Sequence, residues 1–372
     1  MKSELKLDQL KSVKPKCSLS DIKSAKRVYI YGAGGFAESL KSSLTKHDIN
    51  ISSYLVTKEK TQYPNILPIN KYQYMDGDLI LIAIHNRSFN LNDLLQILKK
   101  YNIPEASIVF PWDYYNFFRL ELGWRFWLES NDYLSKNIDK LKSVESLLSD
   151  DESRAIFTNI CLYRSGLNNL YSGYKSTDEQ YFNQLTIKNT NKKISYIDIG
   201  AFDGDSFNSL IEICAVEKAL LFEPDPINFE NLVTRIKSYQ ETIEVLALPL
   251  GIGNNNQIIR FNSQQGEGSS VSAFGNAAIQ IIRFDDCFYN IFKPDLIKMD
   301  VEGLELEVLN GMKNTIIENR PVLTISLYHN PWDLWELPEY LNSILTEYDF
   351  YIRQHEFSTF DCCLYAVPME LR

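Results

Sequence analysis

Three carboxylates lie within one short glycine-containing segment, YIDIGAFDGDSF, at residues 196–207. Asp198 stands inside an apolar run, and Asp203 and Asp205 follow it among two glycines. Glycine-rich turns between a strand and a helix commonly receive phosphates, because the first N–H groups of the helix point at an anion. Carboxylates at such a turn would instead repel a diphosphate and attract a positively charged ligand.

A fourth carboxylate fits the same site. The segment KALLFEPDPINFENL reads as an apolar strand that ends at Glu223. An acid about 20 residues after such a turn can accept hydrogen bonds from the ribose of a nucleoside. S-adenosylmethionine combines a free ribose with a positive sulfonium and an ammonium, so we expect it to bind here. The alternative is that Asp198 and Asp203 only cap the helix that follows.

Two further strand ends carry groups that could handle a proton. Asp300 and Glu302 follow the apolar run LIKM, and His329 follows VLTISLY. Ligands of parallel α/β sheets bind outside the carboxyl ends of the strands, and histidine can take a proton at neutral pH. We predict that His329 is a general base and that Asp300 orients it or the acceptor. Alternatively both are structural, or Asp300 and Glu302 hold Mg²⁺, which prefers oxygen ligands.

The N-terminal part contains a second glycine turn, in RVYIYGAGGFAESL. Gly32, Gly34 and Ala37 have the G-x-G-x-x-A spacing of dinucleotide sites. An acid should then end the second strand and bind a ribose. That strand, in YLVTKEK, is followed by Thr57, and Glu59 comes two positions late. An NAD-dependent oxidoreductase is therefore an alternative interpretation, but the acid that it requires at the end of this strand is absent.

These residues need elements that place them at one sheet edge. Strands and helices alternate in both halves of the chain, which predicts two doubly wound α/β domains. We expect a Rossmann-like domain at 1–111, a helical connector at 112–185 and a second α/β domain at 186–372. The strands of the second domain are expected at 194–199, 218–222, 242–247, 257–261, 279–283, 295–300, 321–328, 348–353 and 360–367, and its helices at about 205–214, 226–238, 304–312 and 335–347. The last two strands have no helix between them, which predicts that one is antiparallel.

Composition narrows the class of protein. The chain has 372 residues, 45% hydrophobic, and a formal net charge of −10, which disfavours nucleic acid as a main partner. The first residues, MKSELKLDQLKSVKPKC, lack the apolar core of a signal peptide. No apolar run approaches the roughly 18 residues of a membrane span. Six cysteines are scattered without a C-x-x-C spacing, so we expect reduced thiols in a cytoplasmic protein.

Four segments, in this order, resemble the FkbM family of S-adenosylmethionine-dependent methyltransferases: YIDIGAFDGDSF, LLFEPDPINFENL, LIKMDVEGLELEVLNGM and LTISLYHNPWDLWELPEYL. The later FYIRQHEFSTFDCCLYAVP is similar to the closing hairpin of that family. The resemblance implies a class I methyltransferase fold, with a seven-stranded sheet whose last strand is antiparallel. It also implies methyl transfer to a hydroxyl oxygen of a sugar, glycan or polyketide.

The resemblance assigns cofactor contacts by position. Glu223 would hold the ribose, and Leu248 would lie near the adenine. Around the aminoacyl and sulfonium end it places Asp198, Gly200, Ala201, Phe202, Asp203 and Ser206. Phe202 stands where the family usually has asparagine.

The N-terminal domain is similar, over the YGAGG turn, to the nucleotide-sugar-binding domain that precedes bacterial sugar acyltransferases. The sequence therefore predicts an O-methyltransferase for a sugar, nucleotide-sugar or glycan acceptor, in bacterial surface-polysaccharide biosynthesis. One alternative is a nucleotide-sugar-binding scaffold with an inactive methyltransferase module; the other is the oxidoreductase. The aromatic-rich segment WDYYNFFRLELGWRFW at 112–127 is expected to pack the domains together or to support a homodimer, with a lipid or partner surface as the alternative.

Overall fold

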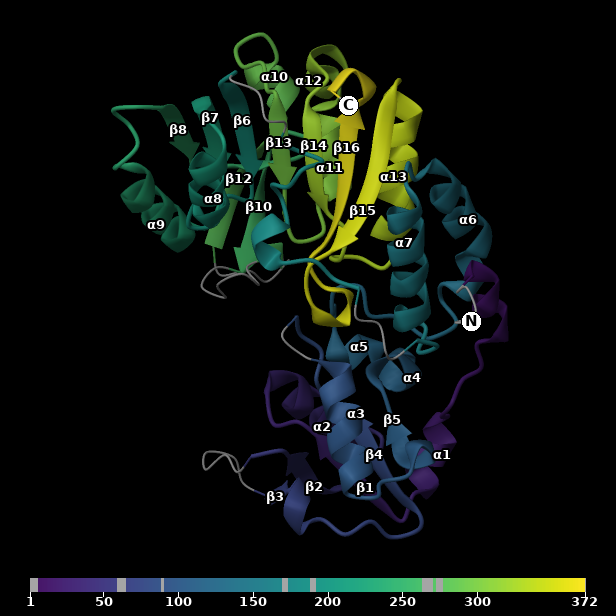
Figure 1. Ribbon diagram of the computed structural model, residues 1–372. Coiled ribbons are helices and arrows are strands. Elements are labelled where there is room, and N and C mark those ends of the chain that lie inside the picture. The colour runs from purple at the N-terminus through teal and green to yellow at the C-terminus, as the bar shows by residue number, and fades with distance from the viewer. Residues whose placement is uncertain are drawn as a thin grey trace. The chain divides into compact units, whose positions relative to one another are not determined.

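A computed structural model of the chain describes residues 6–58, 65–87, 90–168, 173–187, 192–262, 270–271 and 277–371 (Figure 1). The chain divides into two compact units. Unit 1 comprises Met1–Glu145, Ala155–Tyr174 and Glu356–Phe360, and unit 2 comprises Ser146–Arg154, Lys175–His355 and Asp361–Arg372. The three-part division at residues 111 and 185 stays a prediction.

Unit 1 contains a five-stranded parallel sheet in the order β3-β2-β1-β4-β5. Its strands are β1 (Arg27–Tyr31), β2 (Ile51–Val56), β3 (Ile66–Pro68), β4 (Asp78–Ile82) and β5 (Ile108–Val109). The central strand β1 is apolar and buried from Val28 to Tyr31, as expected for a parallel sheet covered on both faces. The strand β3 has only three residues, which is too short for a recognisable pattern in the sequence.

The helices of the first part of the chain are mostly short. They are α1 (Leu19–Ser24), α2 (Gly35–Lys46), α3 (Leu91–Lys100), α4 (Pro111–Tyr114), α5 (Arg119–Leu122), α6 (Ile138–Leu147) and α7 (Asp151–Arg164). The helix α2 begins at Gly35, the last residue of the glycine turn at 32–35, in the strand–turn–helix order that the sequence predicts. Among all described residues, no helix combines the length and the apolar character that a membrane crossing requires.

Unit 2 contains the seven-stranded sheet that the sequence predicts, in the order β15-β16-β14-β13-β6-β7-β8. Its strands are β6 (Ile194–Ile199), β7 (Val216–Phe222), β8 (Glu244–Leu248), β13 (Leu296–Met299), β14 (Val322–Ser326), β15 (Tyr348–Gln354) and β16 (Cys362–Pro368). The last strand, β16, is antiparallel to both of its neighbours, and the other ladders are parallel. The prediction of the α/β fold and of the antiparallel last strand is confirmed.

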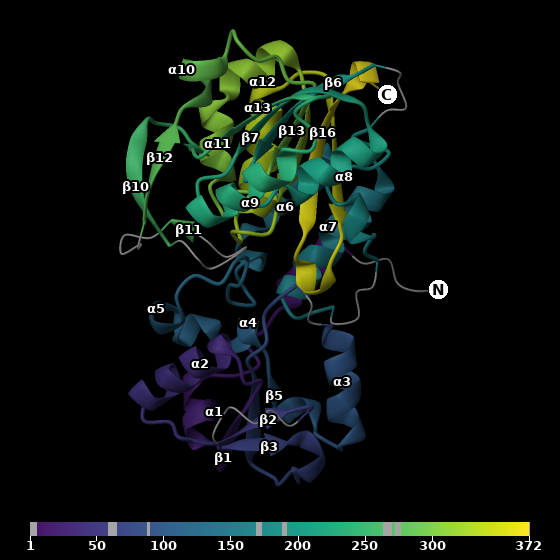
Figure 2. The same ribbon diagram turned by 90° about the vertical axis from the view of Figure 1, so that its left-hand side faces the viewer.

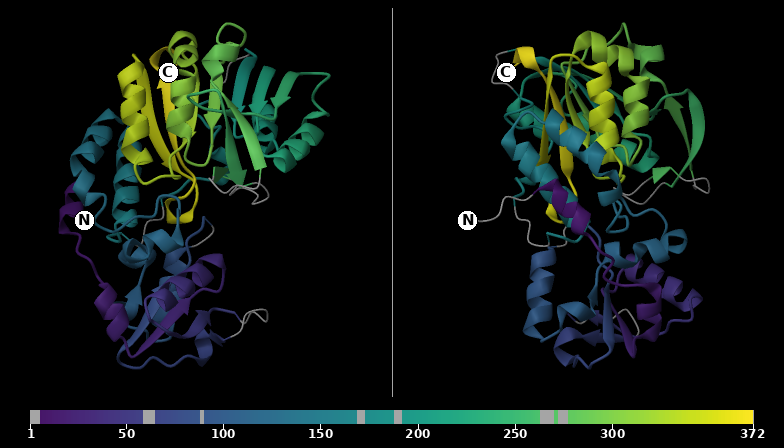
Figure 3. Two further views of the ribbon diagram at one scale, coloured as in Figure 1. Left: turned by 180° about the vertical axis from the view of Figure 1, so that it is seen from behind. Right: turned by 90° about the vertical axis from the view of Figure 1, so that its right-hand side faces the viewer.

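The sheet is built outward from its central strands β6 and β13. From β6 the chain continues to β7 on one side, and from β13 it continues to β14 on the other side. Since strand–helix–strand connections are right-handed, the helices of the two directions lie on opposite faces of the sheet. Figure 2 shows α8 (Asp205–Ile213) and α9 (Pro226–Ile236) together on one face. Figure 3 shows the other face, with α11 (Glu305–Gly311), α12 (Lys313–Asn319) and α13 (Asp333–Ile344). The switch between the two directions lies between β6 and β13.

Two of the strands expected in the second domain, at 257–261 and 279–283, belong to a second, smaller sheet. The four-stranded sheet has the order β11-β10-β12-β9, formed by β9 (Gly251–Ile252), β10 (Gln257–Asn262), β11 (Ser270–Val271) and β12 (Ala277–Ile282). It is followed by α10 (Phe284–Phe288). The pairing of β10 with β12 is antiparallel. Sequence patterns locate such strands but do not say which sheet they join.

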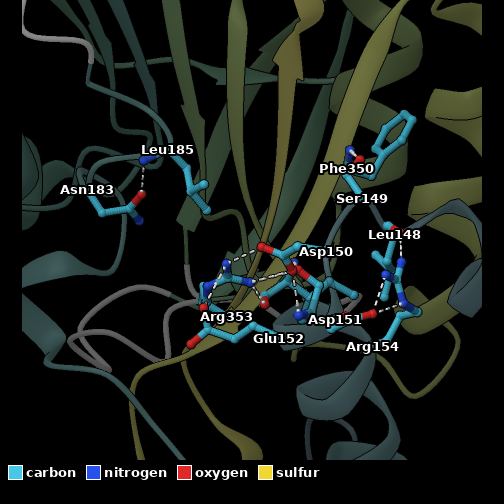
Figure 4. A network of polar contacts seen from close by, with 12 residues as sticks. Leu148, Ser149, Asp150, Asp151, Glu152, Arg154, Asn183, Leu185, Phe350 and Arg353 are labelled. Atoms are coloured by element: carbon cyan, nitrogen blue, oxygen red, sulfur yellow. Dashed lines mark hydrogen bonds and ion pairs between the residues drawn. The ribbon is translucent and has the colours of Figure 1, made fainter. Parts of the chain in front are cut away.

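The edge strand β15 of the main sheet is covered by the segment that precedes α7 (Figure 4). The amide of Ser149 donates to the carbonyl of Phe350 at 2.8 Å, and the amide of Phe350 donates to Oγ of Ser149 at 3.0 Å. Exposed edge strands offer unpaired backbone groups to other chains. These bonds satisfy part of that edge.

An ion-pair network fixes the same segment. The guanidinium of Arg353, in β15, lies 2.7 Å from Asp150 and 3.0 Å from Glu152, and donates to Oγ of Ser153 at 2.7 Å (Figure 4). The side chain of Arg353 is only 8% exposed. A guanidinium buried to this extent needs such partners, because an unpaired buried charge is costly.

Candidate functional site

The turn between β6 and α8 depends on glycine. Gly200 has φ +79°, and a Cβ built there would lie 1.9 Å from the backbone oxygen of Asp300. Gly204 has φ +86° and caps the N-terminus of α8. Phe202, between them, also has a positive φ of 49°. The turn therefore packs closely against the end of β13, which is followed directly by the predicted catalytic residue Asp300.

The carboxylate of Asp198 is paired inside the fold. Its side chain is completely buried and lies 3.0 Å from the ammonium of Lys298. It also accepts hydrogen bonds from Ser206 at 2.5 Å and from Tyr196 at 2.9 Å. Burial raises the pKa of Asp198, while Lys298 and Ser206 act against that rise.

The other two acids of the turn also have partners. Asp203 forms an ion pair with Arg235 in α9 and accepts a hydrogen bond from the amide of Asp205 at 3.2 Å. Asp205 in turn accepts from the amide of Ser206 at 2.7 Å. The turn therefore carries less net negative charge than three neighbouring acids imply, because Lys298 and Arg235 form ion pairs with two of them. The helix-capping alternative concerned Asp198 and Asp203. Of these two, Asp203 accepts from the first amide of α8, whereas Asp198 contacts α8 through the side chain of Ser206.

Glu223 is held directly beside the turn, one residue after β7. Its Oε2 accepts from the amide of Phe202 at 2.9 Å, and its Oε1 accepts from the amide of Asp225 at 2.8 Å. The amide of Glu223 donates to the carbonyl of Leu248, at the end of β8, at 3.2 Å. The structure thus brings together the predicted turn, ribose and adenine positions, and Ala201 in the turn is buried.

Burial governs the charge of Glu223, which is 6% exposed. Burial raises the pKa of its carboxyl to about 7, against the amides of Asp225 and Phe202. The nearby carboxylate of Asp225 adds to the rise, and Lys298 opposes it. The ionised form therefore becomes dominant only near neutral pH. A ligand that donates hydrogen bonds to the carboxylate would stabilise that form.

The predicted catalytic residues meet at the ends of β13 and β14. Nε2 of His329 lies 3.2 Å from Oδ1 of Asp300 and 3.8 Å from Oε2 of Glu302. Its Nδ1 lies 2.7 Å from Oε1 of Glu305, at the start of α11. His329 is fully buried, whereas the side chains of Asp300 and Glu302 are 23% and 22% exposed. In this conformation an acceptor can reach the two carboxylates more readily than the imidazole.

The charges around His329 favour its protonated form. Burial by itself would lower the pKa of His329, but the carboxylates of Glu305, Glu302 and Asp300 outweigh burial and hold the pKa well above its ordinary value. For Asp300, burial alone would raise the pKa, and His329 and Lys298 lower it. The assignment of His329 as the base stays a prediction. One ligand atom each from Asp300, Glu305 and His329 also lies within 4.8 Å of the others, a spacing that could hold a metal ion.

Three residues of this site are not among those predicted from the sequence: Lys298, Glu305 and Tyr181. Lys298 pairs with Asp198 across adjacent strands. The pattern that indicates this pair is a single charged residue at the third position of each apolar segment, negative in YIDI and positive in LIKM. Glu305 lies three residues after Glu302, and this spacing indicates that the two side chains can face the same site. Tyr181 donates to Oδ2 of Asp300 at 2.7 Å, and no local pattern in its segment indicates this contact.

The glycine turn of unit 1 is built differently. Gly32 has φ +120°, and a Cβ there would lie 2.9 Å from the backbone oxygen of Ala83, so glycine is required by the fold. A Cβ on Gly34, by contrast, would have no atom of the described residues within 4 Å. Thr57, after β2, shares a hydrogen bond of 2.7 Å with the hydroxyl of Tyr31. Glu59 lies outside the described residues.

Comparison with known proteins places the C-terminal part of the chain. The family model of the methyltransferase FkbM domain matches residues 198–352. The crystal structure of Methyltransferase FkbM from Methylobacillus flagellatus KT superposes with a TM-score of 0.76, covering 97% of this chain and 96% of that one at 21% identity. That likeness concerns the fold, and it extends over both units.

One curated relative is similar in sequence. The Hexuronic acid methyltransferase AglP of Haloferax volcanii is 32% identical over 110 residues, which are 28% of this chain and 45% of that protein. The chain therefore matches less than half the length of this relative. Together with the domain match, these findings support an FkbM methyltransferase domain in unit 2. The resemblance of the N-terminal domain to sugar acyltransferases stays a prediction.

Proposed function

We propose that the protein is an S-adenosylmethionine-dependent O-methyltransferase that acts on a hydroxyl of a sugar or glycan. The observation that carries this proposal is the position of Glu223. Its carboxylate is bonded to the amide of Phe202 in the turn, and the same turn abuts the backbone of Asp300. A cofactor with its ribose at Glu223 would therefore have its reactive end near Asp300.

The reaction requires alignment more than strong chemistry. The acceptor oxygen attacks the methyl carbon in line, the carbon–sulfur bond breaks, and the hydroxyl proton passes to the pair of Asp300 and His329. Holding the three atoms in line is the larger contribution, and a proton acceptor adds about 10²–10⁴-fold. We assign the contact with the acceptor hydroxyl to Asp300, which is partly exposed, with His329 and Tyr181 fixing its two oxygens.

A sugar or glycan as the acceptor is supported by the similarity of the chain to a curated relative. The curated relative is described as a hexuronic acid methyltransferase, and a sugar hydroxyl suits a site with partly exposed carboxylates that accept hydrogen bonds. We place the reaction in the biosynthesis of a surface polysaccharide in the cytoplasm, with a free, nucleotide-linked or polymeric sugar as acceptor. S-adenosylmethionine would be the methyl donor, and Mg²⁺ at Asp300 and Glu302 is the alternative way of binding the acceptor.

Calorimetry with S-adenosylhomocysteine, NAD and a UDP-sugar tests the proposal. We expect S-adenosylhomocysteine to bind and Glu223→Ala to weaken it by about 10- to 100-fold, since charge-assisted hydrogen bonds contribute about 1.5–3 kcal/mol. Mass spectrometry of candidate sugar acceptors should then detect a gain of one CH₂. Binding of NAD, without S-adenosylhomocysteine, would instead support the oxidoreductase. Binding of a UDP-sugar alone would support the scaffold.

A further inference from the structure

A single buried lysine connects the two ends of the site. Lys298, in β13, is 3% exposed, and its ammonium lies 3.0 Å from Oδ1 of Asp198. The same ammonium donates a hydrogen bond of 2.6 Å to the backbone oxygen of Gly200. Its donors are therefore directed at the strand that carries the glycine turn and at the first residue of the turn itself.

The other side of the lysine faces the acceptor end. The ammonium lies 5.1 Å from the ring centroid of Tyr181, within the range of a cation–π contact. The hydroxyl of Tyr181 donates to Oδ2 of Asp300 at 2.7 Å. Asp198 also lies next to Lys298 in the ladder between β6 and β13. One side chain thus contacts the cofactor turn directly and the acceptor carboxylate through one aromatic residue.

We propose that Lys298 is a positioning residue of the methyl transfer, which fixes the Gly200 turn on the cofactor side and, through Tyr181, the carboxylate of Asp300 on the acceptor side. This inference rests on the proposed function. The physical reason is that the reacting sulfur, methyl and oxygen must be collinear, and small displacements of either partner reduce the rate strongly. The ammonium is buried and paired, so its position is much better defined than that of an exposed lysine.

A purely structural role must be separated from this one. Asp198 and Lys298 form a buried ion pair, and removing one partner alone leaves an uncompensated charge that destabilises the protein. Removing both charges with side chains of similar shape can restore stability. The hydrogen bond to the carbonyl of Gly200 is not restored by that double change, because methionine has no N–H donor.

The experiment therefore compares Lys298→Met, Asp198→Asn and the double variant by thermal unfolding, by calorimetry with S-adenosylhomocysteine, and by turnover. Lys192→Met serves as the matched control, because Lys192 is 71% exposed and pairs with Asp295 in the same unit. We expect the double variant to recover most of the unfolding temperature that Lys298→Met loses. Its affinity for S-adenosylhomocysteine should still be about tenfold weaker than that of the wild type, and its turnover at least 100-fold slower.

Tyr181→Phe tests the acceptor side and keeps the ring beneath the ammonium. We expect kcat to fall about tenfold, while the affinity for S-adenosylhomocysteine stays within twofold. Recovery of both affinity and turnover in the double variant would show that Lys298 only maintains the fold, and would overturn the inference. An unchanged kcat in Tyr181→Phe would refute the second part of the inference, that Lys298 positions the carboxylate of Asp300 through Tyr181. If the wild type bound no S-adenosylhomocysteine, the proposed function would fail, and this inference with it.

Discussion

At the scale of single residues, the site consists of acids whose charges are decided by their neighbours. Asp198 and Asp203 are paired with Lys298 and Arg235, which reduces the negative charge that they offer to a sulfonium. Their assignment as cofactor contacts stays a prediction. Glu223 has no basic partner in direct contact among the described residues and depends on two backbone amides. Burial raises the pKa of its carboxyl to about 7, so its charge is sensitive to pH near neutrality and to a ligand that donates hydrogen bonds.

Cofactor affinity should depend on pH through Glu223. The pKa of its carboxyl is raised to about 7 by burial, and ribose hydroxyls would bind the ionised form more tightly, because a carboxylate is a stronger acceptor than a neutral carboxyl. Binding must then release a proton below pH 7, so the affinity for S-adenosylhomocysteine should fall by up to about tenfold per pH unit below 7 and level off above it. Calorimetry between pH 5.5 and 8 measures this slope. A Glu223→Gln variant should show weaker binding without the slope, and an equal slope in that variant would refute the assignment.

Catalysis should fail when His329 is removed. We expect His329→Ala to cut turnover by about 10²–10⁴-fold, because Oδ1 of Asp300 loses the imidazole that lies 3.2 Å away. Affinity for S-adenosylhomocysteine should stay within about threefold, since His329 lies on the acceptor side. Initial rates and calorimetry on the same preparation test both parts. Turnover close to that of the wild type, in a folded variant, would exclude any catalytic role for His329.

Chelation of metal ions should leave the rate unchanged. Both ring nitrogens of His329 already face carboxylates, at 2.7 Å from Glu305 and 3.2 Å from Asp300. An ion coordinated by the imidazole would have to displace one of these contacts. Turnover should therefore be the same after dialysis against EDTA as after dialysis against buffer. If EDTA abolished activity and Mg²⁺ or Mn²⁺ restored it, Asp300, Glu302 and Glu305 would have to be reassigned as metal ligands.

At the scale of elements, the parallel strands β6, β7 and β13 place their carboxyl ends side by side. The turn after β6, Glu223 after β7 and Asp300 after β13 meet there for that reason. The edge strand β15 supplies none of these residues. Its attachment to residues 149–153 stabilises the sheet that carries the site.

The Arg353 network should contribute to stability and not to cofactor contact. Replacing Arg353 with methionine removes a nearly buried guanidinium from Asp150 and Glu152, which are 33% and 45% exposed. We expect a loss of about 2–3 kcal/mol, typical of hydrogen bonds to charged groups. Thermal unfolding should detect it as a lower transition temperature. The control Lys192→Met, which breaks an exposed pair, should cost at most about 1 kcal/mol, and an equal loss in both variants would contradict the argument.

At the scale of the whole molecule, the chain has two compact units, each with its own mainly parallel sheet. The fold of the methyltransferase from Methylobacillus flagellatus matches both units, whereas the FkbM domain model matches residues 198–352. The predicted cofactor residues all belong to unit 2. We therefore expect unit 1 to serve the acceptor or its carrier.

Gly34→Val tests this division of roles. Gly34 has open space around it among the described residues and no positive φ, so a valine should be accommodated there without unfolding unit 1. If an acceptor or its nucleotide approaches this turn, the branched side chain should obstruct it. We expect KM for the acceptor to rise at least tenfold, with the affinity for S-adenosylhomocysteine unchanged. An unchanged KM would argue that this turn does not bind the acceptor, and micromolar affinity for NAD would reopen the oxidoreductase alternative.

The sequence by itself determined the alternation of strands and helices, the antiparallel last strand, and the positions of Glu223, Asp300 and His329 at strand ends. These follow from local patterns, since apolar runs, glycine turns and charged residues at run ends are visible along the chain. Only the tertiary structure decided how the charges are paired. Lys298 contacts Asp198 from another strand, Tyr181 reaches Asp300 across 119 positions of the chain, and Glu305 contacts His329 from the start of α11. Such pairings depend on strand order and side-chain direction, and these are set by packing of the whole unit and not by spacing in the sequence.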